Sequence, residues 1–360
     1  MGNYLNHELV VGLDAGGTRT RAVLAAAAEA SDASAAGGPV LGESAGGPGN
    51  ALTVPLPQLT DHLTEALDRV VPEEARGRVV AVTGGFAGAT AASADDPGTV
   101  RARTALTEAL RRLGIPCDRI GVCSDIEAAF ASAPGTPAEG LALVAGTGAV
   151  AMRITDRHAT TTVDGDGWLL GDEGSGFWIG RSAVRAALRM ADGRGRATVL
   201  AGWVGRSLGL PVDVLPKGGI PSYDRGRAVP PPGTAAHPTG VPGWSRARRE
   251  DFRRHLLPAV MTDPPIRLAR FAPLVAEAAA EKDAVAETIL SEAADHLLDT
   301  VRALEPLPGE RIVATGGLLG PQGPLTAPLT ERLHAHGLRL DWVADGCAGA
   351  VALARLAYTS

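Results

Sequence analysis

The chain has 360 residues, which is long for a single hydrophobic core and predicts two domains. Hydrophobic residues make up 45% of the chain and charged residues 21%, as expected for a soluble globular protein. The formal net charge of −6 argues against a basic surface for nucleic acid or acidic membranes. Aromatic residues make up only 4%, which argues against stacking platforms for bases or sugar polymers.

The three cysteines, Cys117, Cys123 and Cys347, form no CxxC pair and no metal-ligand spacing with histidine. They suit a reducing compartment, where small buried thiols need no partner. The N-terminal segment lacks the charged and apolar regions of a signal peptide, and no apolar run approaches the length of a membrane span. We therefore expect a cytoplasmic protein.

The first predicted element is a strand that ends in a glycine turn. An apolar run, residues 9–13, ends at Asp14; Gly16 and Gly17 turn the chain, and a second apolar run, residues 22–28, leads away. Because glycine takes backbone angles closed to other residues, such a turn can fold around a bulky anion and aim N–H groups at it. Asp14 supplies a carboxylate that can hold Mg²⁺ through its waters. An ordinary hairpin is the alternative for this stretch alone.

Strands and helices then alternate through the first half of the chain. The patterns predict a strand at 39–44, a helix at 56–70, a strand at 78–82, a helix at 100–113 and a strand at 119–123. This alternation implies a mainly parallel sheet with ligands at the strand ends.

Two polar residues stand at loop positions in this half. Asn50 ends the glycine-rich loop 46–50, where it either binds a sugar hydroxyl or caps the following helix. Asp125 follows a strand end and precedes a helix expected at 127–133. A lone carboxylate there has the reach and acidity of a general base, and the alternative is a helix N-cap.

A second unit begins as the first one does. A strand at 141–145 leads into the turn Gly146-Thr147-Gly148, and a strand at 150–154 runs back. We therefore predict two similar halves, residues 1–135 and 136–360, that face each other and each offer a glycine turn to one ligand. The repeat favours phosphate binding over a plain hairpin.

The block 164–180, DGDGWLLGDEGSGFWIG, holds four acidic residues and six glycines, which is hard to explain as core. We expect Asp172 to begin a helix, where capping is its structural alternative. Asp164 and Asp166 are expected on a flexible loop from which a carboxylate can reach a ligand.

The remainder contains an insertion and a third glycine turn. Residues 211–249 are rich in proline and glycine and are interpreted as an extended insertion or mobile loop. Helices are expected at 273–280 and 285–304. A strand at 311–314 runs into Thr315-Gly316-Gly317, a turn that fits close approach to a base or ribose. Small residues at 345–350 open the last helix and permit tight packing.

In this order, the pieces resemble the sugar kinase and actin-like ATPase superfamily and, within it, N-acetylglucosamine kinases of the BadF/BadG/BcrA/BcrD type. The resemblance covers most of the chain outside the insertion and is carried by the segments LDAGGT, SD, GTG, GDEGSGFWIG and TGGLLG. It implies an α/β fold of two ribonuclease-H-like domains around a nucleotide cleft. It also implies ATP and Mg²⁺ as cofactors and a small-molecule sugar as substrate, with no nucleic acid or membrane partner. The sequence leaves a homodimer open.

The resemblance also implies roles for individual residues. Asp14 would face the metal, and Asp125 would be the base that deprotonates a sugar hydroxyl, that on C6. The nucleotide would contact Gly16, Gly17, Thr18, Thr147, Gly148, Gly316 and Gly317. The sugar's other groups would be bound by Asn50, Gly165, Asp166 and Asp172. We therefore predict ATP-dependent phosphorylation of a hexosamine, N-acetylglucosamine in the first place, with glucosamine or another hexose as the alternative.

Two departures from the family pattern bear on the substrate. Ala149 stands where members usually carry a serine, and Asp166 stands near the position of a tryptophan. The second change places an acid where an aromatic normally lines the sugar pocket, which would suit an amino sugar such as glucosamine.

Three other functions are less well supported by the sequence. An activating ATPase with an iron–sulfur cluster would need a cysteine in the helix after Asp125, and residues 126–132 contain none. A sugar-sensing transcription factor would need a DNA-binding domain first, and about eight residues precede the opening strand. Nothing in the sequence supports a cytoskeletal polymer.

Overall fold

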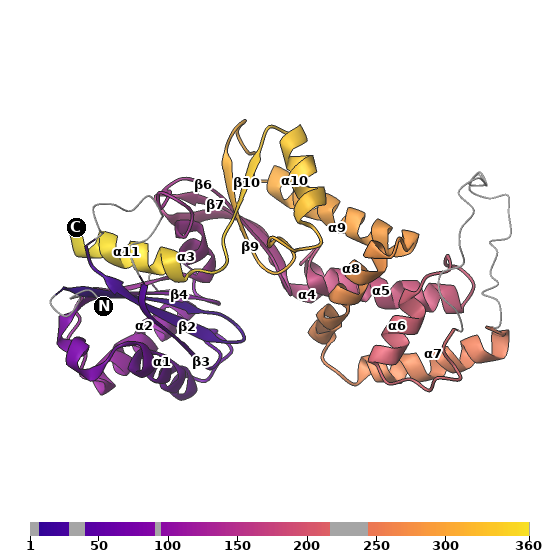
Figure 1. The fold of residues 1–360 in the computed structure, drawn as a ribbon, viewed down its shortest axis with the longest axis horizontal. Coiled ribbons are helices and arrows are strands. Elements are labelled where there is room, and N and C mark those ends of the chain that lie inside the picture. Colours follow the sequence, from indigo (N-terminus) through magenta and orange to yellow (C-terminus); the bar gives the residue numbers. More distant parts are fainter. Residues whose placement is uncertain (1–6, 29–39, 91–94, 217–243, 360) are drawn as a thin grey trace.

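The computed structural model describes residues 7–28, 40–90, 95–216 and 244–359. Two five-stranded sheets form its frame (Figure 1). The strands of the first sheet are β1 (Leu9–Ala15), β2 (Thr20–Ala26), β3 (Val40–Gly46), β4 (Val79–Phe86) and β5 (Ile120–Ser124). Those of the second are β6 (Gly140–Ala145), β7 (Ala149–Thr155), β8 (His158–Asp164), β9 (Arg311–Thr315) and β10 (Arg339–Trp342).

The two sheets have the same topology. The first has the order β3-β2-β1-β4-β5, and the second, read from β8, has the order β8-β7-β6-β9-β10. In each, the first three strands in sequence pair antiparallel and the last two join in parallel. The predicted fold class, two ribonuclease-H-like halves, is confirmed. The prediction of a mainly parallel sheet is wrong, because each sheet is mixed.

Helices cover the first sheet on both faces. They are α1 (Leu56–Val70), the 3₁₀ turn η2 (Glu73–Arg78), α2 (Pro97–Arg112), α3 (Asp125–Ala131) and the C-terminal α11 (Cys347–Thr359). Side chains alternate along β1, so Leu9, Val11 and Leu13 pack in the core under α1 and α2, whereas Val10 packs with Val351 of α11. Both faces of this central strand are therefore buried.

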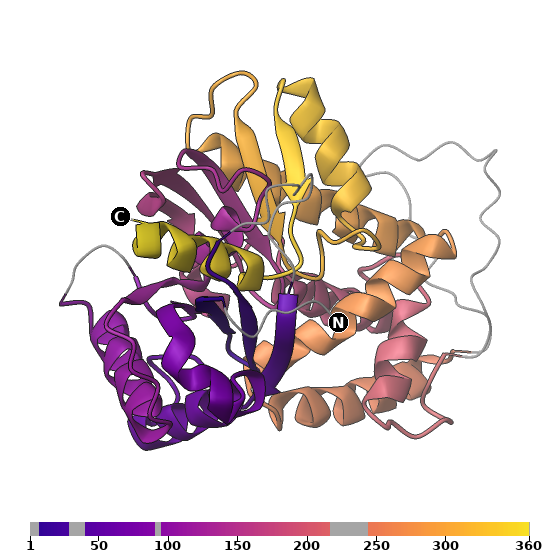
Figure 2. The same cartoon turned by 60° about the vertical axis from the view of Figure 1, so that its left-hand side comes forward.

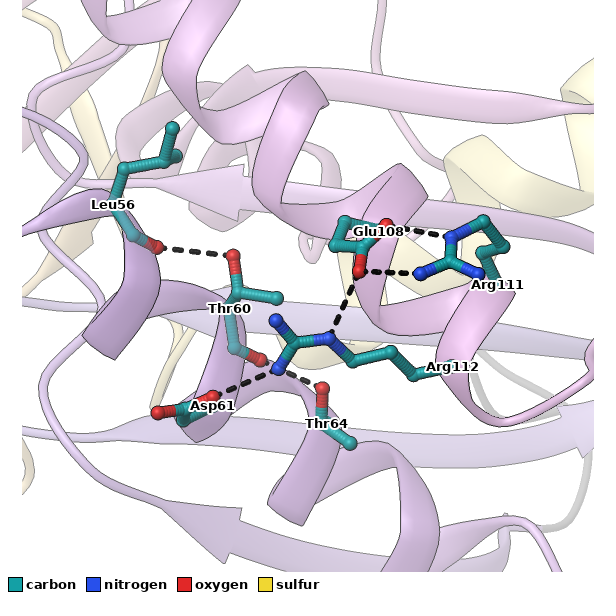
Figure 3. Close-up of polar contacts among 7 residues, drawn as sticks. All are labelled: Leu56, Thr60, Asp61, Thr64, Glu108, Arg111 and Arg112. Carbon is teal, nitrogen blue, oxygen red and sulfur yellow. Dashed lines mark hydrogen bonds and ion pairs between the residues drawn. The ribbon is translucent and has the colours of Figure 1, made fainter.

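Ion pairs join α1 and α2 at the surface (Figure 3). Arg112 of α2 donates to Glu108 on its own helix (3.0 Å) and to Asp61 of α1 (2.8 Å). Arg111 also donates to Glu108, and these two guanidinium groups hold the pKa of the Glu108 carboxyl at about 2. The network thus links the exposed faces of the two helices.

The last helix returns to the first sheet and packs closely there, as its small residues predict. A Cβ on Gly12 of β1 would lie 2.5 Å from the Val351 nitrogen, and one on Gly349 would overlap the Ala128 carbonyl oxygen of α3. The Gly349 N–H donates to Ser132 Oγ (2.8 Å). A division of the chain at residue 135 stays a prediction, and the C-terminal helix packs on the sheet of the first half.

The helices of the second half gather on one side of the second sheet, at the right of Figures 1 and 2. They are α4 (Gly167–Leu170), α5 (Gly176–Ala191), α6 (Leu200–Ser207), α7 (Arg246–Met261), η3 (Pro265–Phe271), α8 (Ala272–Ala280), α9 (Ala284–Arg302) and α10 (Thr326–Ala335). The largest hydrophobic core lies among them, because apolar faces of α5, α8 and α9 pack together and on the sheet.

The predicted insertion, residues 211–249, lies only partly within the described residues, because 217–243 fall outside them. Its two ends are built into the core: Val214, Leu215 and Trp244 are buried, and the Trp244 indole N–H donates to the Val214 carbonyl (2.9 Å). Residues 246–249 of this stretch are helical, since α7 begins at Arg246, and the insertion itself stays a prediction. No helix among the described residues combines the length and the apolarity needed to cross a membrane.

Candidate active site

A cleft of about 300 Å³ is lined by residues from both sheets. The end of β1 contributes Asp14, the start of α3 contributes Asp125, and the end of β9 contributes Thr315. Six of the residues predicted for the site line this cleft: Asp14, Gly16, Gly17, Thr18, Asp125 and Gly316. The others, Asn50, Thr147, Gly148, Gly165, Asp166, Asp172 and Gly317, are not among its lining residues.

Asp14 is a largely buried carboxylate near the end of β1. The Gly346 N–H donates to Asp14 Oδ2 (3.2 Å). Burial raises the pKa of Asp14, and the nearby Asp345 carboxylate raises it further, while the Gly346 hydrogen bond and the charges of Arg21 and Arg19 act in the opposite direction. A cation beside Asp14 would relieve this burial penalty.

Asp125 is the first residue of α3, and it is not the helix cap. Ser124 is the N-cap: its Oγ accepts the Glu127 N–H (3.1 Å), and Glu127 Oε2 accepts the Ser124 N–H (2.8 Å). The N-cap alternative for Asp125 is therefore wrong, and its Oδ1 accepts the Ile126 N–H (3.0 Å).

Burial raises the pKa of the Asp125 carboxyl to about 6, and the charge of Asp14 adds to this effect. The group is thus more basic than an exposed aspartate and is still mostly ionised at pH 7. Such a carboxylate can accept a proton from a hydroxyl group held in the cleft.

The turn after β1 differs from the prediction in one respect. The Gly16 N–H donates to the Arg19 carbonyl (3.0 Å), which closes the turn. Neither Gly16 nor Gly17 takes a left-handed backbone angle, so the predicted need for glycine-only angles is wrong. A Cβ on Gly17 would meet nothing within 4 Å. What glycine gives here is open space over the turn.

Gly316, unlike Gly16 and Gly17, takes a backbone angle that favours glycine. Its φ is +103°, and a Cβ there would overlap the backbone of Ala145 at the end of β6. Gly317 is different, because a Cβ on it would have nothing within 4 Å. The third glycine turn therefore has one glycine fixed by packing and one with free space beside it.

The turn Gly146-Thr147-Gly148 is tied to the start of α5. The carbonyl groups of Gly146 and Thr147 accept the N–H groups of Gly176 (2.8 Å) and Phe177 (3.1 Å). These bonds satisfy donors that a helix leaves unpaired at its N-terminus. They also hold the turn in place relative to a long buried helix.

Asp172 lies against this turn. Its Oδ1 accepts the Ala149 N–H (3.0 Å), and a Cβ on Gly148 would lie 2.7 Å from the same oxygen. Burial raises the pKa of Asp172, and the charges of Asp164 and Asp166 add to it. The prediction that Asp172 begins a helix is wrong: α5 begins at Gly176, with Ser175 as its N-cap.

The loop before Asp172 is organised by Asp164. Its carboxylate accepts the N–H groups of Gly165 (2.7 Å), Asp172 (2.6 Å) and Glu173 (2.9 Å), so it is engaged by backbone and does not reach out as expected. Gly165 has φ +79°, and Asp166 is exposed at the N-cap position of α4, where its side chain makes no capping bond.

The Asn50 side chain stabilises a turn and does not cap a helix. Its Oδ1 accepts the N–H groups of Leu52 (3.0 Å) and Thr53 (3.0 Å). The N-cap position of α1 is held by Pro55, so the predicted alternative, that Asn50 caps this helix, is wrong. Its carbonyl oxygen is thus already occupied within its own loop.

Arg21 of β2 and Asp345 form an ion pair in the cleft, and neither residue was predicted for the site. Donor atoms of Asp14, Asp345 and Cys347 also lie within 4.8 Å of one another. Carboxylate oxygens suit a hard cation such as Mg²⁺, whereas a thiol does not. Asp345 follows the strand β10, which was not predicted. Recognition of that strand would have identified Asp345 as a candidate site residue, because it lies just after a strand end.

Comparisons with known proteins agree with this fold. The sequence profile of the BadF/BadG/BcrA/BcrD ATPase family matches residues 11–334. The chain is 34% identical over 100 residues to an N-acetylmuramic acid/N-acetylglucosamine kinase of Clostridium acetobutylicum, and this match spans 28% of the chain and 32% of that relative.

Two solved structures share the architecture. A protein of Porphyromonas gingivalis provisionally named N-acetylglucosamine kinase superposes with a TM-score of 0.63 at 20% identity, over 96% of this chain and 99% of that one. A protein of Chromobacterium violaceum with the same provisional name gives a TM-score of 0.61, also at 20% identity and with the same coverage. At such identity the likeness shows the fold.

Proposed function

The chain belongs to the BadF/BadG/BcrA/BcrD ATPase family, and we propose that it transfers the terminal phosphoryl group of ATP to a sugar hydroxyl. The observation that carries the proposal is the convergence of Asp14, Asp125 and the turn at Gly16 and Gly17 on one cleft. Phosphoryl transfer through a loose transition state needs mainly in-line placement and neutralisation of charge. A buried carboxylate of raised pKa beside an open glycine turn offers a base next to room for phosphates.

Each of these groups would have a separate task. Asp125 would orient the sugar hydroxyl and accept its proton, because its pKa of about 6 lets it stay ionised and basic near neutrality. The N–H groups of residues 16–18 would approach the terminal phosphates. Asp14 would hold Mg²⁺, which when bound neutralises phosphate charge, and its raised pKa fits a carboxylate that gains from a nearby cation.

The remaining predicted contacts are also part of the proposal, and of these only Gly316 lines the cleft. Thr147 and Gly148 would contact phosphates from the second half, and Gly316 and Gly317 would lie by the adenosine. The sugar would be contacted by Asn50, Gly165, Asp166 and Asp172. The Asn50 carboxamide oxygen and the Asp172 carboxylate already accept backbone N–H groups.

The proposed acceptor is a hexosamine, N-acetylglucosamine in the first place, phosphorylated on its C6 hydroxyl. Support comes from the named activity of the Clostridium acetobutylicum relative over the matched segment. Asp166 is exposed and makes no capping bond, so its carboxylate is available to an amino group, and glucosamine is the alternative acceptor.

The second candidate, an activating ATPase with an iron–sulfur cluster, is less well supported. The helix α3 contains no cysteine, and Cys123 before it is buried with its thiol donating to the Gly84 carbonyl. Burial and nearby carboxylates raise the pKa of Cys123, which opposes the thiolate that a cluster needs.

A panel of hexoses and hexosamines with ATP and Mg²⁺ tests the proposal, with ADP release measured against a blank without sugar. We expect ADP release to depend on sugar and to be greatest with N-acetylglucosamine or glucosamine. ADP release that is equal with and without every sugar would reject the kinase and favour the ATPase.

A further inference from the structure

A second cavity of about 570 Å³ lies in the helical part of the molecule, between α5, the segment after it and the first turns of α9. We call it the arginine cavity, because Arg185, Arg189, Arg194 and Arg196 line it. It shares no lining residue with the cleft. In Figure 1, α5 and α9 lie on the opposite side of the second sheet from α3 and α11.

The lining of this cavity is positively charged, whereas the chain as a whole has a net charge of −6. Among the described residues, Glu292 is the only carboxylate in its lining. Beside the cavity, Asp192 pairs with Arg194 and Arg253. Its described lining therefore holds four arginines and one carboxylate. The Arg185 guanidinium makes no hydrogen bond or ion pair with any residue that the structure describes, so its donors are open to a ligand.

The walls of the arginine cavity are tied together by backbone. The N–H groups of Arg194 (2.9 Å) and Gly195 (2.7 Å) both donate to the Arg189 carbonyl, so the segment after α5 folds back on the helix end. The buried Asp283 carboxylate, which caps α9, also accepts the Val199 N–H (2.8 Å). The backbone that carries the arginines is therefore held in place, while the four arginine side chains are exposed.

The lining indicates what kind of anion fits. Guanidinium groups match phosphate oxygens in geometry, and a phosphate monoester carries a charge of about −2 near neutrality, opposite in sign to that of the arginines. Val285 offers a partly exposed apolar side chain, and Ser182 and Thr288 lie beside it, with the Thr288 hydroxyl donating to the Ala284 carbonyl (2.7 Å). This mixture suits the carbon face and hydroxyl groups of a sugar, and the volume is that of a small-molecule site.

A nucleotide fits less well. Trp178 is the one aromatic residue among the described lining residues. It is only 8% exposed, and its ring packs edge-on against His296 with the ring centres 4.9 Å apart. Little of its face remains for a base to stack on. We propose that the arginine cavity binds a sugar phosphate, at a site separate from the cleft.

Isothermal titration tests this with N-acetylglucosamine 6-phosphate and glucose 6-phosphate as ligands, in low salt and without ATP or Mg²⁺. The result then stands whether or not the chain phosphorylates sugars. We expect the wild-type protein to bind a sugar phosphate, and the double variant Arg185→Gln/Arg189→Gln to bind it at least about tenfold more weakly, because charge-assisted hydrogen bonds are lost. Arg254→Gln, which changes an exposed arginine of α7 outside the cavity, should bind as wild type does.

Further arms separate the possible sources of binding. N-acetylglucosamine without phosphate should not bind at this site, and ADP and inorganic phosphate should bind more weakly than the sugar phosphates. Equal affinity of the wild type and the double variant would place the sugar phosphate elsewhere and overturn the proposal, as would no binding by the wild type. Inorganic phosphate binding as tightly as the sugar phosphates would overturn the sugar part. If the double variant melts at a lower temperature, Arg185→Gln alone, compared with Arg185→Lys, gives the same test with one exposed residue.

Discussion

Asp14 at the end of β1 and Asp125 at the start of α3 line the same cleft, and the charge of Asp14 adds to burial in raising the pKa of Asp125 to about 6. Two carboxylates close together in a partly buried site repel each other when both are ionised. A metal ion at Asp14 would reduce this repulsion. The pair thus links the proposed metal ligand to the proposed base, and most of the predictions below depend on it.

Replacement of Asp125 by Asn should abolish most turnover and leave nucleotide binding nearly intact. The carboxamide keeps the shape of the side chain and cannot accept a proton, and the loss of a general base costs roughly 10²–10⁴-fold in rate. Sugar-dependent ADP release and ATP affinity are measured on the same preparation. Asp118→Asn, at an exposed position outside the cleft lining, is the matched control. Turnover that survives in Asp125→Asn would show that another group is the base.

Turnover should depend on pH through the same carboxylate. If Asp125 must be ionised to accept a proton, kcat/KM should rise as the pH increases through about 6 and level off above it. Bound Mg²⁺ would lower the midpoint of the kcat profile, since a cation favours the ionised forms of both Asp14 and Asp125. A rate that is flat between pH 5 and 8 would contradict this assignment.

The same pKa shift predicts a gain in stability for the inactive variant. Because the pKa of Asp125 is raised from 3.8 to about 6, the folded state binds the proton more tightly than the unfolded state does. Stability is therefore lost as the pH rises from about 4 to about 6. Without ligands at pH 7, Asp125→Asn should raise the free energy of unfolding by up to about 3 kcal/mol.

Urea unfolding at pH 7 and pH 4 measures this difference between the wild type and Asp125→Asn. The gain should largely disappear at pH 4, where the wild-type carboxyl is protonated in the folded state. A variant that is equally destabilised at both pH values would show that the carboxylate makes favourable contacts that outweigh its burial.

Gly316 and Gly317 are adjacent and should respond oppositely to alanine. Gly316→Ala should destabilise the fold by about 2 kcal/mol or more, because φ is +103° and the new Cβ would overlap Ala145. Gly317→Ala has open space and should change the free energy of unfolding by about 0.5 kcal/mol or less. Thermal unfolding of both variants decides the matter, and equal melting temperatures would contradict the close approach of β6 to this turn.

Asp166→Trp tests the proposed sugar contact. If the exposed carboxylate favours an amino sugar, its replacement should shift the ratio of kcat/KM values from glucosamine toward N-acetylglucosamine. Thr160→Trp, at an exposed position on β8, controls for the addition of a large aromatic side chain. An unchanged ratio would remove Asp166 from the sugar site.

The sequence by itself determined the repeated frame. Apolar runs such as residues 9–13 and 141–145 are short and are followed by glycine turns. Both features are local in the sequence and indicate a strand and the point where it ends. The helix predicted at 56–70 agrees with α1 (Leu56–Val70) because its apolar face repeats at helical spacing and Pro55 stands before it. The strands β8 and β10 were missed, since β8 is mostly polar and exposed and β10 is only four residues long.

Only the tertiary structure decided which polar groups share a site and which are already engaged. Asp164 and Asn50 read as candidates for a ligand, yet backbone N–H groups occupy their oxygens, whereas Asp345 and Arg21 were overlooked and meet in the cleft. The pKa of Asp125 likewise depends on burial and on Asp14, residues apart in sequence that folding brings together. Local backbone preference acts over a few neighbouring residues, while hydrogen-bond partners and the electrostatic field are set by groups that become neighbours only when the chain is folded.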